Sequence, residues 1–437
     1  MEDPPLLIRR ERLLGVPLPL AYYFVASVVF WFCCTAAMLF WRQIKHWPYP
    51  YRSPLMPAPL CRDIWWCSEQ FAHLHSPQFF TSRGLELYAY PPGTALPFAF
   101  FQNVLPHFHS IPFLGLTFLG VAALGTAFAK GLIQLGVERW RAALVTACAF
   151  VLMFPFTFVW TTGNIEIVLY LALSSGVLAF LRGRFTVAAV LFGFCASMKF
   201  YPFVMLALFL PFRRYKEIAI GAGSFVLSSL AGLWLLCPNL QIAYQELGKS
   251  LRANRVAYME SFLIPQSAAD HSIWGLIKTL WFLHSRRLHF PSWTVSAYTA
   301  TMAVIGISLY FGRIRKLPLL NQIVCLYLCL LLMVPESFEY TLVHVSVVWA
   351  LLVLYMWQRA QNGLRVSHLT PVFVYLAFIL SVQNELIYRH GFWGQAKCIV
   401  LLLLLGTALV QPWDGLENSD WVTRLLRQRQ VTEFADA

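Results

Sequence analysis

A polar, aromatic stretch, residues 61–98, lies between two long apolar segments and contains one early aspartate and several aromatic side chains, of which three are singled out here. Asp63 comes first, Trp65 and Trp66 follow, and Tyr90 stands near the end of the stretch. A carboxylate held near a hydroxyl can take its proton as a general base, and flat rings can stack on a sugar. The pattern therefore predicts Asp63 as a base and the three aromatic residues as walls of a sugar site. The alternative for Asp63 is an ordinary loop acid or a helix cap, and the alternative for Tyr90 is a turn that leads from the loop into a helix.

A lysine and a proline interrupt a long apolar run in the middle of the chain. Lys199 stands beside Tyr201 and Pro202, and proline cannot continue the hydrogen-bond ladder of a helix. We therefore expect a broken helix here. A cation at such a break, near the membrane surface, suits the phosphate of a lipid. The alternative is that Lys199 extends its ammonium group to the interface while its stem stays in lipid.

Residues 238–291 form a basic loop, which contains Arg252 and Arg255. A guanidinium group can donate two parallel hydrogen bonds to phosphate oxygens. We expect these two arginines to help Lys199 hold a phosphate. A solvated loop that contacts lipid head groups is the alternative.

Further polar side chains lie where apolar segments meet loops. An ionisable group inside an apolar segment is costly unless it is paired or wet. Each is therefore expected to contact a sugar or acceptor, or else to pair with a neighbouring helix or its end. Two of the acids, Glu336 and Glu339, are also a second source of the base. The candidates are Asn164, Glu166, Tyr201, His271, Glu336, Glu339 and His344.

The composition indicates an integral membrane protein. Hydrophobic residues make up 59% of the chain and charged residues 12%, which is about half of the roughly 25% typical of soluble domains. The net charge of +13 is explained by loop Lys and Arg that set orientation and meet anionic lipids. We expect membrane lipids as partners, and no nucleic acid. No polar stretch suffices for a soluble domain, so residues 1–437 are predicted to form a single integral membrane domain.

The apolar segments predict an all-α, polytopic membrane protein with about 12 transmembrane helices. With the N-terminus inside, each short inner loop carries at least two Lys or Arg residues, as the orientation rule requires. Both termini are then cytoplasmic, and the loops 42–110 and 238–291 face the other side. The first loop is large and contains amphipathic helices, with 93–105 as an interfacial or re-entrant helix. The predicted crossings are residues 19–41, 111–136, 142–161, 164–181, 185–199, 200–212, 217–237, 292–311, 318–334, 339–357, 368–383 and 395–411.

The ten cysteines do not predict a metal site. Most lie in apolar segments, where they act as small apolar residues, and no His/Cys cluster has the spacing of metal ligands. The chain also lacks a phosphate-binding loop and a dinucleotide fingerprint, so we expect no metal and no cofactor. Cys61 and Cys67 flank Asp63. Whether they form a disulfide is open, since the compartment permits one but their separation on a helix is poor geometry.

The order of these motifs resembles glycosyltransferase family 87, the polyprenyl-phosphate-mannose-dependent α-mannosyltransferases of the GT-C superfamily. The similar pieces span roughly residues 60–345. Three positions depart from the family pattern: Asn164 replaces Gln, Glu166 replaces Asn, and Tyr340 stands where a His is usual. The similar pieces are Asp63, the Tyr90-Pro91-Pro92 turn, Gly163-Asn164-Ile165-Glu166, the Lys199–Pro202 break with Arg213 and Arg214, Asp270–Gly275, and Pro335–Glu339.

The resemblance implies a GT-C-like fold, a lipid-linked sugar donor, an extracytoplasmic active site and Asp63 as the base. We therefore expect a membrane glycosyltransferase that moves a hexose, with mannose the expected sugar, from a polyprenyl-phosphate-sugar donor to a glycolipid or glycan acceptor, with inversion. The alternative is a multi-spanning lipid or solute transporter or flippase. A transporter should line a path through both membrane halves with polar residues, and the inner half of this chain has few.

Overall fold

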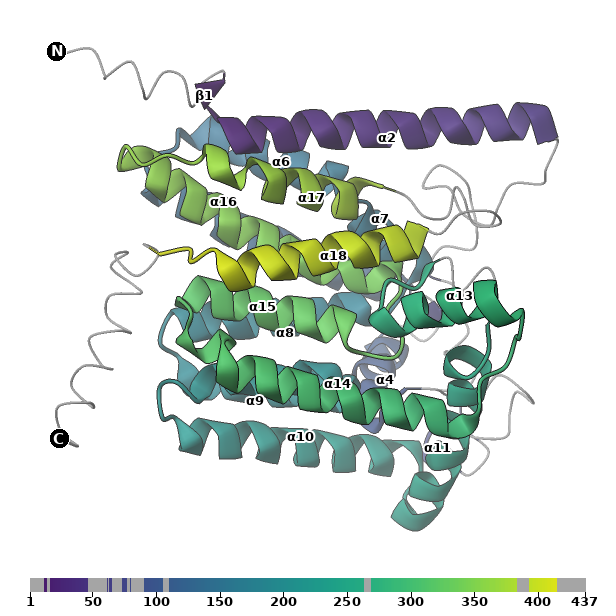
Figure 1. Ribbon diagram of the computed structural model, residues 1–437. Coiled ribbons are helices and arrows are strands. Elements are labelled where there is room, and N and C mark those ends of the chain that lie inside the picture. The colour runs from purple at the N-terminus through teal and green to yellow at the C-terminus, as the bar shows by residue number, and fades with distance from the viewer. Residues whose placement is uncertain are drawn as a thin grey trace, which may run out of the picture.

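The computed structural model describes residues 12–13, 16–45, 61, 63–64, 73–76, 79, 90–104, 110–262, 269–382 and 393–414. Trp65, Trp66 and Cys67 lie outside the described residues. Within these ranges the structure is helical, apart from a short antiparallel pairing of β1 (Arg12–Leu13) with β2 (Val16–Pro17). Figure 1 shows the long helices lying side by side, with α2 at one edge of the bundle and α10 at the opposite edge.

The first half of the bundle is built mainly from long α-helices. A short 3₁₀ turn precedes α4, and a longer 3₁₀ helix follows Lys199. The elements are α2 (Leu18–Lys45), η2 (Pro92–Thr94), α4 (Ala95–Val104), α5 (Ser110–Gln134), α6 (Arg139–Leu152), α7 (Phe154–Thr162), α8 (Glu166–Leu181), α9 (Phe185–Met198), η3 (Tyr201–Phe209) and α10 (Tyr215–Leu236).

The second half begins with three helical elements that are too short to cross a membrane, α11, η4 and α13, and continues with the long helix α14. Figure 1 shows α11 at a steep angle to the long helices, near the end of the bundle where α4, α7 and α13 also lie. The elements are α11 (Leu240–Asn254), the π-helix η4 (Arg255–Met259), α13 (Ile273–Ser285), α14 (Ser292–Gly312), η5 (Ile314–Lys316), α15 (Leu319–Leu332), η6 (Glu339–His344), α16 (Val345–Gln361), η7 (Ser367–Leu369), α17 (Thr370–Ser381) and α18 (Trp393–Val410).

The prediction of an all-α, multi-pass membrane protein is confirmed. Six helices are long and apolar enough to cross a bilayer, and the bent pair α6–α7 makes up to seven among the described residues. Shorter apolar helices occupy Glu166–Leu181, Phe185–Met198, Leu319–Leu332 and Ser367–Ser381. Residues 200–212, predicted as a crossing, contain the 3₁₀ helix η3. A total of about 12 crossings therefore stays a prediction.

The helices differ in how much of their apolar surface is buried inside the bundle. Every residue of α15 is buried, so this helix lies inside the bundle. The span of α10 buries only 11% of its apolar window and exposes Leu227 and Trp234. A helix that exposes most of its apolar surface is rare on soluble monomers. The exposed apolar face of α10 is therefore what we expect of a helix surrounded by lipid.

Two breaks between helices have clear local causes. Pro155 stands in the first turn of α7, where its missing amide hydrogen is tolerated, and α6 and α7 meet at a bend of 57°. Lys199 is extended, with φ −147° and ψ 136°, and Pro202 stands in the first turn of η3. The predicted break at Lys199 is therefore present, and it turns the lysine side chain out of helix α9.

Candidate active site

A tight junction between α7 and α8 holds the start of the first polar loop. Gly163 ends α7 with φ +66°, a conformation that favours glycine. A Cβ at this position would lie 2.5 Å from the Cα atom of Cys61, so a larger residue would push the loop away. The amide of Cys61 also donates to the carbonyl of Thr161 at 3.0 Å. These contacts fix the backbone two residues before Asp63.

Asp63 and Asn164 meet across this junction. The Nδ2 group of Asn164 donates to Oδ2 of Asp63 at 3.0 Å. The Oδ1 atom of Asn164 accepts from the amide of Glu166 at 3.0 Å, so the same side chain supports the first turn of α8. Asp63 is half-buried, and its carboxylate lies at the beginning of that helix.

Glu166 is the centre of a buried polar cluster. Its side chain is fully buried, and its Oε2 atom lies 2.6 Å from Nζ of Lys199. Its Oε1 atom lies 2.8 Å from Nε2 of His344 and also accepts a hydrogen bond from the hydroxyl of Tyr201. An acid in an apolar helix is costly unless it is paired, and these contacts supply the pairing. The cluster therefore unites α8, the α9–η3 break and η6.

Lys199 reaches from this cluster toward the surface. Its side chain is 17% exposed, and its ammonium group lies 4.8 Å from the ring centre of Tyr340 and 5.9 Å from that of Tyr201. A cation over an aromatic face is attracted by the ring. Lys199 is therefore held by a carboxylate on one side and by aromatic rings on the other, with part of its surface open.

The Tyr-Pro-Pro-Gly turn packs beside Lys199. A Cβ at Gly93 would lie 2.1 Å from Oγ of Ser197, and the hydroxyl of Thr94 donates to the carbonyl of Met198 at 2.7 Å. The turn is thus fixed against the last residues of α9. Tyr90, which precedes it, packs its ring 5.8 Å from that of Phe98.

Tyr340 connects the parts of this end of the bundle. Its hydroxyl lies within electrostatic range of Asp63, Tyr90, Glu166 and Glu336. The structure thus brings together five predicted site residues from four separate parts of the sequence, with Tyr201, Glu336 and His344 around them; the five are Asp63, Tyr90, Asn164, Glu166 and Lys199.

A second buried network lies next to this cluster. Oδ1 of Asp270 accepts from the amides of Ser272 and Ser337, at 3.0 and 3.2 Å, and Nζ of Lys278 lies 3.7 Å from Oδ2 of Asp270. Burial raises the pKa of Asp270, an effect that Lys278 opposes. The network ties the start of α13 to the turn after α15.

His271 is part of the same network. Its Nε2 atom lies 2.9 Å from Oγ of Ser337 and 3.1 Å from Oγ1 of Thr341. Burial, with a smaller effect of Lys397, lowers the pKa of His271 to about 3. The imidazole is therefore neutral at physiological pH, and it holds the 337–341 turn in place.

Glu339 is occupied by a buried partner. Nζ of Lys397 lies 2.8 Å from Oε1 and 2.9 Å from Oε2 of Glu339, and it also donates to the carbonyl of Val382 at 2.7 Å. Lys397 is fully buried and Glu339 is 2% exposed. This pair anchors η6 to α18, which leaves Glu339 little room to contact a sugar.

The sequence model of glycosyltransferase family 87 matches residues 88–335, more than half of the chain. The chain belongs to glycosyltransferase family 87. It is therefore a membrane glycosyltransferase, which uses a sugar donor and an acceptor. Neither a curated protein nor a solved structure matches it.

The family match covers only part of the candidate site of this family 87 glycosyltransferase. Tyr90, Asn164, Glu166, Lys199 and Tyr201 lie inside residues 88–335, together with His271. Asp63 precedes the range, and the turn from Glu336 to His344 follows it. The contacts of Asp63 with Asn164, and of His344 with Glu166, therefore attach the flanking parts of the chain to the matched part.

The two loop arginines make their contacts elsewhere. Nε of Arg255 lies 2.7 Å from Oε1 of Glu260, and its Nη2 atom donates to Oγ of Ser296 at 3.1 Å. Arg252 is exposed on α11 and donates to the carbonyl of Gly248 at 3.2 Å. The contacts of these two arginines with described residues lie within residues 248–296, so their expected role at the phosphate remains a prediction.

Two further predictions concern cysteine and metal ligands. Cys61 has a free, buried thiol, which donates to the carbonyl of Trp160 at 3.6 Å; Cys67 lies outside the described residues. Among the residues that the structure describes, no three His, Cys, Asp or Glu side chains gather closely enough to hold a metal ion.

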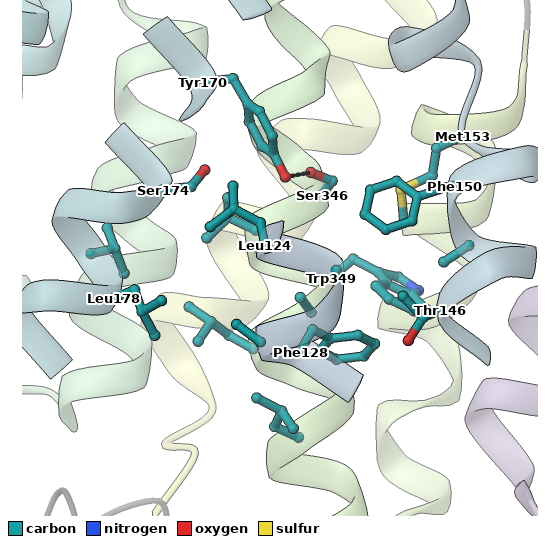
Figure 2. A pocket seen from close by; sticks show the side chains of 18 of the residues that line it. Leu124, Phe128, Thr146, Phe150, Met153, Tyr170, Ser174, Leu178, Ser346 and Trp349 are labelled. Carbon is teal, nitrogen blue, oxygen red and sulfur yellow. Dashed lines mark hydrogen bonds between the residues drawn. The ribbon is translucent and has the colours of Figure 1, made fainter. Parts of the chain in front are cut away.

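An apolar pocket of about 140 Å³ lies between α5, α6, α8 and α16. Figure 2 shows Phe128, Phe150 and Trp349 around it, and the hydrogen bond between Ser346 and Tyr170 at its edge. That bond measures 3.2 Å. The ring of Tyr170 packs 6.0 Å from that of His344, so buried rings separate the pocket from the Glu166 cluster.

Proposed function

We propose that this glycosyltransferase moves a hexose, with mannose the first candidate, from a polyprenyl-phosphate-sugar to a glycolipid or glycan acceptor, with inversion at the anomeric carbon. The observation that carries the proposal is the continuous line of contacts Asp63–Asn164–Glu166–Lys199. It puts a half-buried carboxylate and a partly exposed ammonium group at the same end of the bundle.

Each end of that line has a chemical task in an inverting transfer. Asp63 takes the proton of the acceptor hydroxyl as that oxygen attacks the anomeric carbon. Lys199 stabilises the negative charge that develops on the leaving phosphate. Glu166 keeps the ammonium group of Lys199 in place before the donor arrives, since it binds Lys199 and His344 at once.

The aromatic residues supply the sugar-facing surface in this proposal. Tyr90 and Tyr201 come from the predicted set, and Tyr340 is added because its ring lies against the Lys199 ammonium group. Trp65 and Trp66 remain predicted to stack on the sugar. Arg252 and Arg255 remain predicted to bind the phosphate together with Lys199. In this proposal His271 and Glu339 do not contact the sugar. Their buried contacts with Ser337 and Lys397 instead fix the backbone of the 337–341 turn.

A transfer assay tests the proposal against the transporter alternative. Purified protein is incubated with radiolabelled polyprenyl-phosphate-mannose and a panel of glycolipid and glycan acceptors, and in parallel with nucleotide-linked mannose. We expect a new labelled product from the lipid donor alone. Movement of intact label across a proteoliposome membrane, with no new product, would favour the transporter.

We also propose that the site faces the extracytoplasmic side and that both termini are cytoplasmic. The basis is the distribution of Lys and Arg over the loops. Two exposed positions lie near opposite ends of α10: Lys216 in its first turn and Gln245 beyond its last residue. In a background without native cysteines, Gln245→Cys should react with an impermeant thiol reagent in intact cells and Lys216→Cys should not. The reverse labelling pattern would invert the orientation.

A further inference from the structure

The turn that follows α15 carries an acid, Glu336, that the proposed transfer does not yet use. Its neighbours are fixed on both sides. The amide of Ser337 donates to Asp270 at 3.2 Å, and its carbonyl accepts from the amide of His271 at 2.9 Å. Glu339 is anchored by Lys397. The backbone of the turn is therefore rigid, and the position of Glu336 is defined.

The side chain of Glu336 differs from the acids around it. Glu166, Asp270 and Glu339 each have an ion pair, with Lys199, Lys278 and Lys397. Glu336 is half-buried and has neither a hydrogen bond nor an ion pair within the part of the chain that the structure describes. Because no described neighbour occupies this partly exposed carboxyl group, it is available to a ligand beside the candidate site.

The ionisable groups that interact electrostatically with Glu336 lie in four places along the chain. They are Asp270, just before α13, Lys278 in α13, Lys199 after α9, and the phenol of Tyr340 in η6. Both lysines already have a carboxylate partner. If Glu336 were ionised, none of these described groups would supply a further positive charge to neutralise it. Burial, with a smaller effect of Asp270, raises the pKa of Glu336 to about 7, and Lys278 and Lys199 oppose the rise.

We propose that Glu336 enters the reaction as a neutral acid, whose protonated carboxyl group donates a hydrogen bond to the donor phosphate beside Lys199. This inference rests on the proposed function. An anionic phosphate is repelled by an ionised Glu336 but can accept a hydrogen bond from the neutral form. Unlike Glu166, Asp270 and Glu339, Glu336 loses no ion pair with a described residue when it is protonated.

The step is balanced without a further reactant. The acceptor oxygen forms a bond to the anomeric carbon as the bond from that carbon to the phosphate oxygen breaks. The hydroxyl proton passes to Asp63, and the proton of Glu336 stays on Glu336 while its hydrogen bond to the departing phosphate shortens. Hydrogen bonds to a developing charge stabilise the transition state, so Glu336 acts on both donor binding and turnover.

Donor binding measured against pH, without an acceptor, tests this role. A short-chain polyprenyl-phosphate-mannose is a phosphodiester, which carries one negative charge throughout the range from about pH 5.5 to pH 8.5. Any pH dependence of its Kd therefore comes from the protein. For the wild type we expect tight binding while Glu336 is protonated and a Kd that rises, by up to about tenfold per pH unit, above its pKa.

Two variants and one control identify the group. Glu336→Gln keeps a neutral donor, so its Kd should match the low-pH wild-type value and stay flat with pH. Glu336→Ala should bind weakly at every pH. Glu246→Gln alters a partly exposed acid paired with Lys249 on α11, and it should keep the wild-type profile.

Three outcomes would contradict the proposal in distinguishable ways. A wild-type Kd that does not change with pH, or a Glu336→Gln profile that still rises with pH, would exclude Glu336 as the titrating donor. A different result would count against the proposed function itself. If neither the wild type nor the two Glu336 variants bind this donor, and no transfer from it occurs, polyprenyl-phosphate-sugars are excluded as the donor.

Discussion

Asp63→Asn is expected to lower the rate of sugar transfer by about 10²–10⁴-fold, the usual effect of losing a general base. Asn retains a side-chain oxygen that can accept the hydrogen bond from Asn164, which measures 3.0 Å to Oδ2 of Asp63. The loop should therefore keep its place against α7 and α8, and the donor should bind as before. Single-turnover transfer and donor Kd, measured on the same preparation, separate these effects.

Asp63→Glu is the matched variant, since it keeps the base but moves it by one methylene group. It should retain more activity than the Asn variant. Turnover close to the wild-type rate in Asp63→Asn would exclude Asp63 as the base. Glu336 would then be the next acid to test, because it is within electrostatic range of the same Tyr340 hydroxyl.

Lys199→Met is expected to weaken donor binding by roughly 10–150-fold, which corresponds to the loss of a charge-assisted hydrogen bond of about 1.5–3 kcal/mol. Met keeps most of the apolar stem and removes the ammonium group that lies 2.6 Å from Glu166 and 4.8 Å from the ring of Tyr340. Turnover should fall as well, because the phosphate gains negative charge in the transition state.

Three further variants show whether the effect belongs to the phosphate. Lys199→Met leaves the buried Glu166 without its ammonium partner, so the double variant Lys199→Met/Glu166→Gln removes that unpaired charge. Lys199→Arg restores a cation and should recover part of the affinity. Lys249→Met, in an exposed pair on α11, should change nothing. Wild-type donor affinity in the double variant would mean that Lys199 only balances Glu166.

Much of the fold could be predicted because apolar length and proline act locally. The interruption at Lys199 and Pro202 indicated a broken helix, and the structure has extended backbone at Lys199 followed by η3. The bend between α6 and α7 was not predicted. Pro155 lies in a continuous apolar run, and hydropathy alone does not distinguish a proline at a helix start from one in a straight crossing.

The site was predicted less completely because its partners are remote in sequence. Glu166 was singled out as an acid in an apolar segment, but its pairing with both Lys199 and His344 depends on how α8, α9 and η6 pack. Lys397 was missed. A lone lysine inside the apolar segment of α18 was a sufficient signal, because such a group needs a partner, and that partner is Glu339.

A structure of the protein with polyprenyl-phosphate-mannose bound, determined by electron cryo-microscopy, tests the central claim most directly. That claim is that Asp63 and Lys199 serve one donor at one end of the bundle. We predict the phosphate within hydrogen-bond distance of Nζ of Lys199, and the anomeric carbon on the side that faces the Asp63 carboxylate. A donor phosphate bound away from Lys199, for instance at Arg213 and Arg214 at the start of α10, would contradict the account.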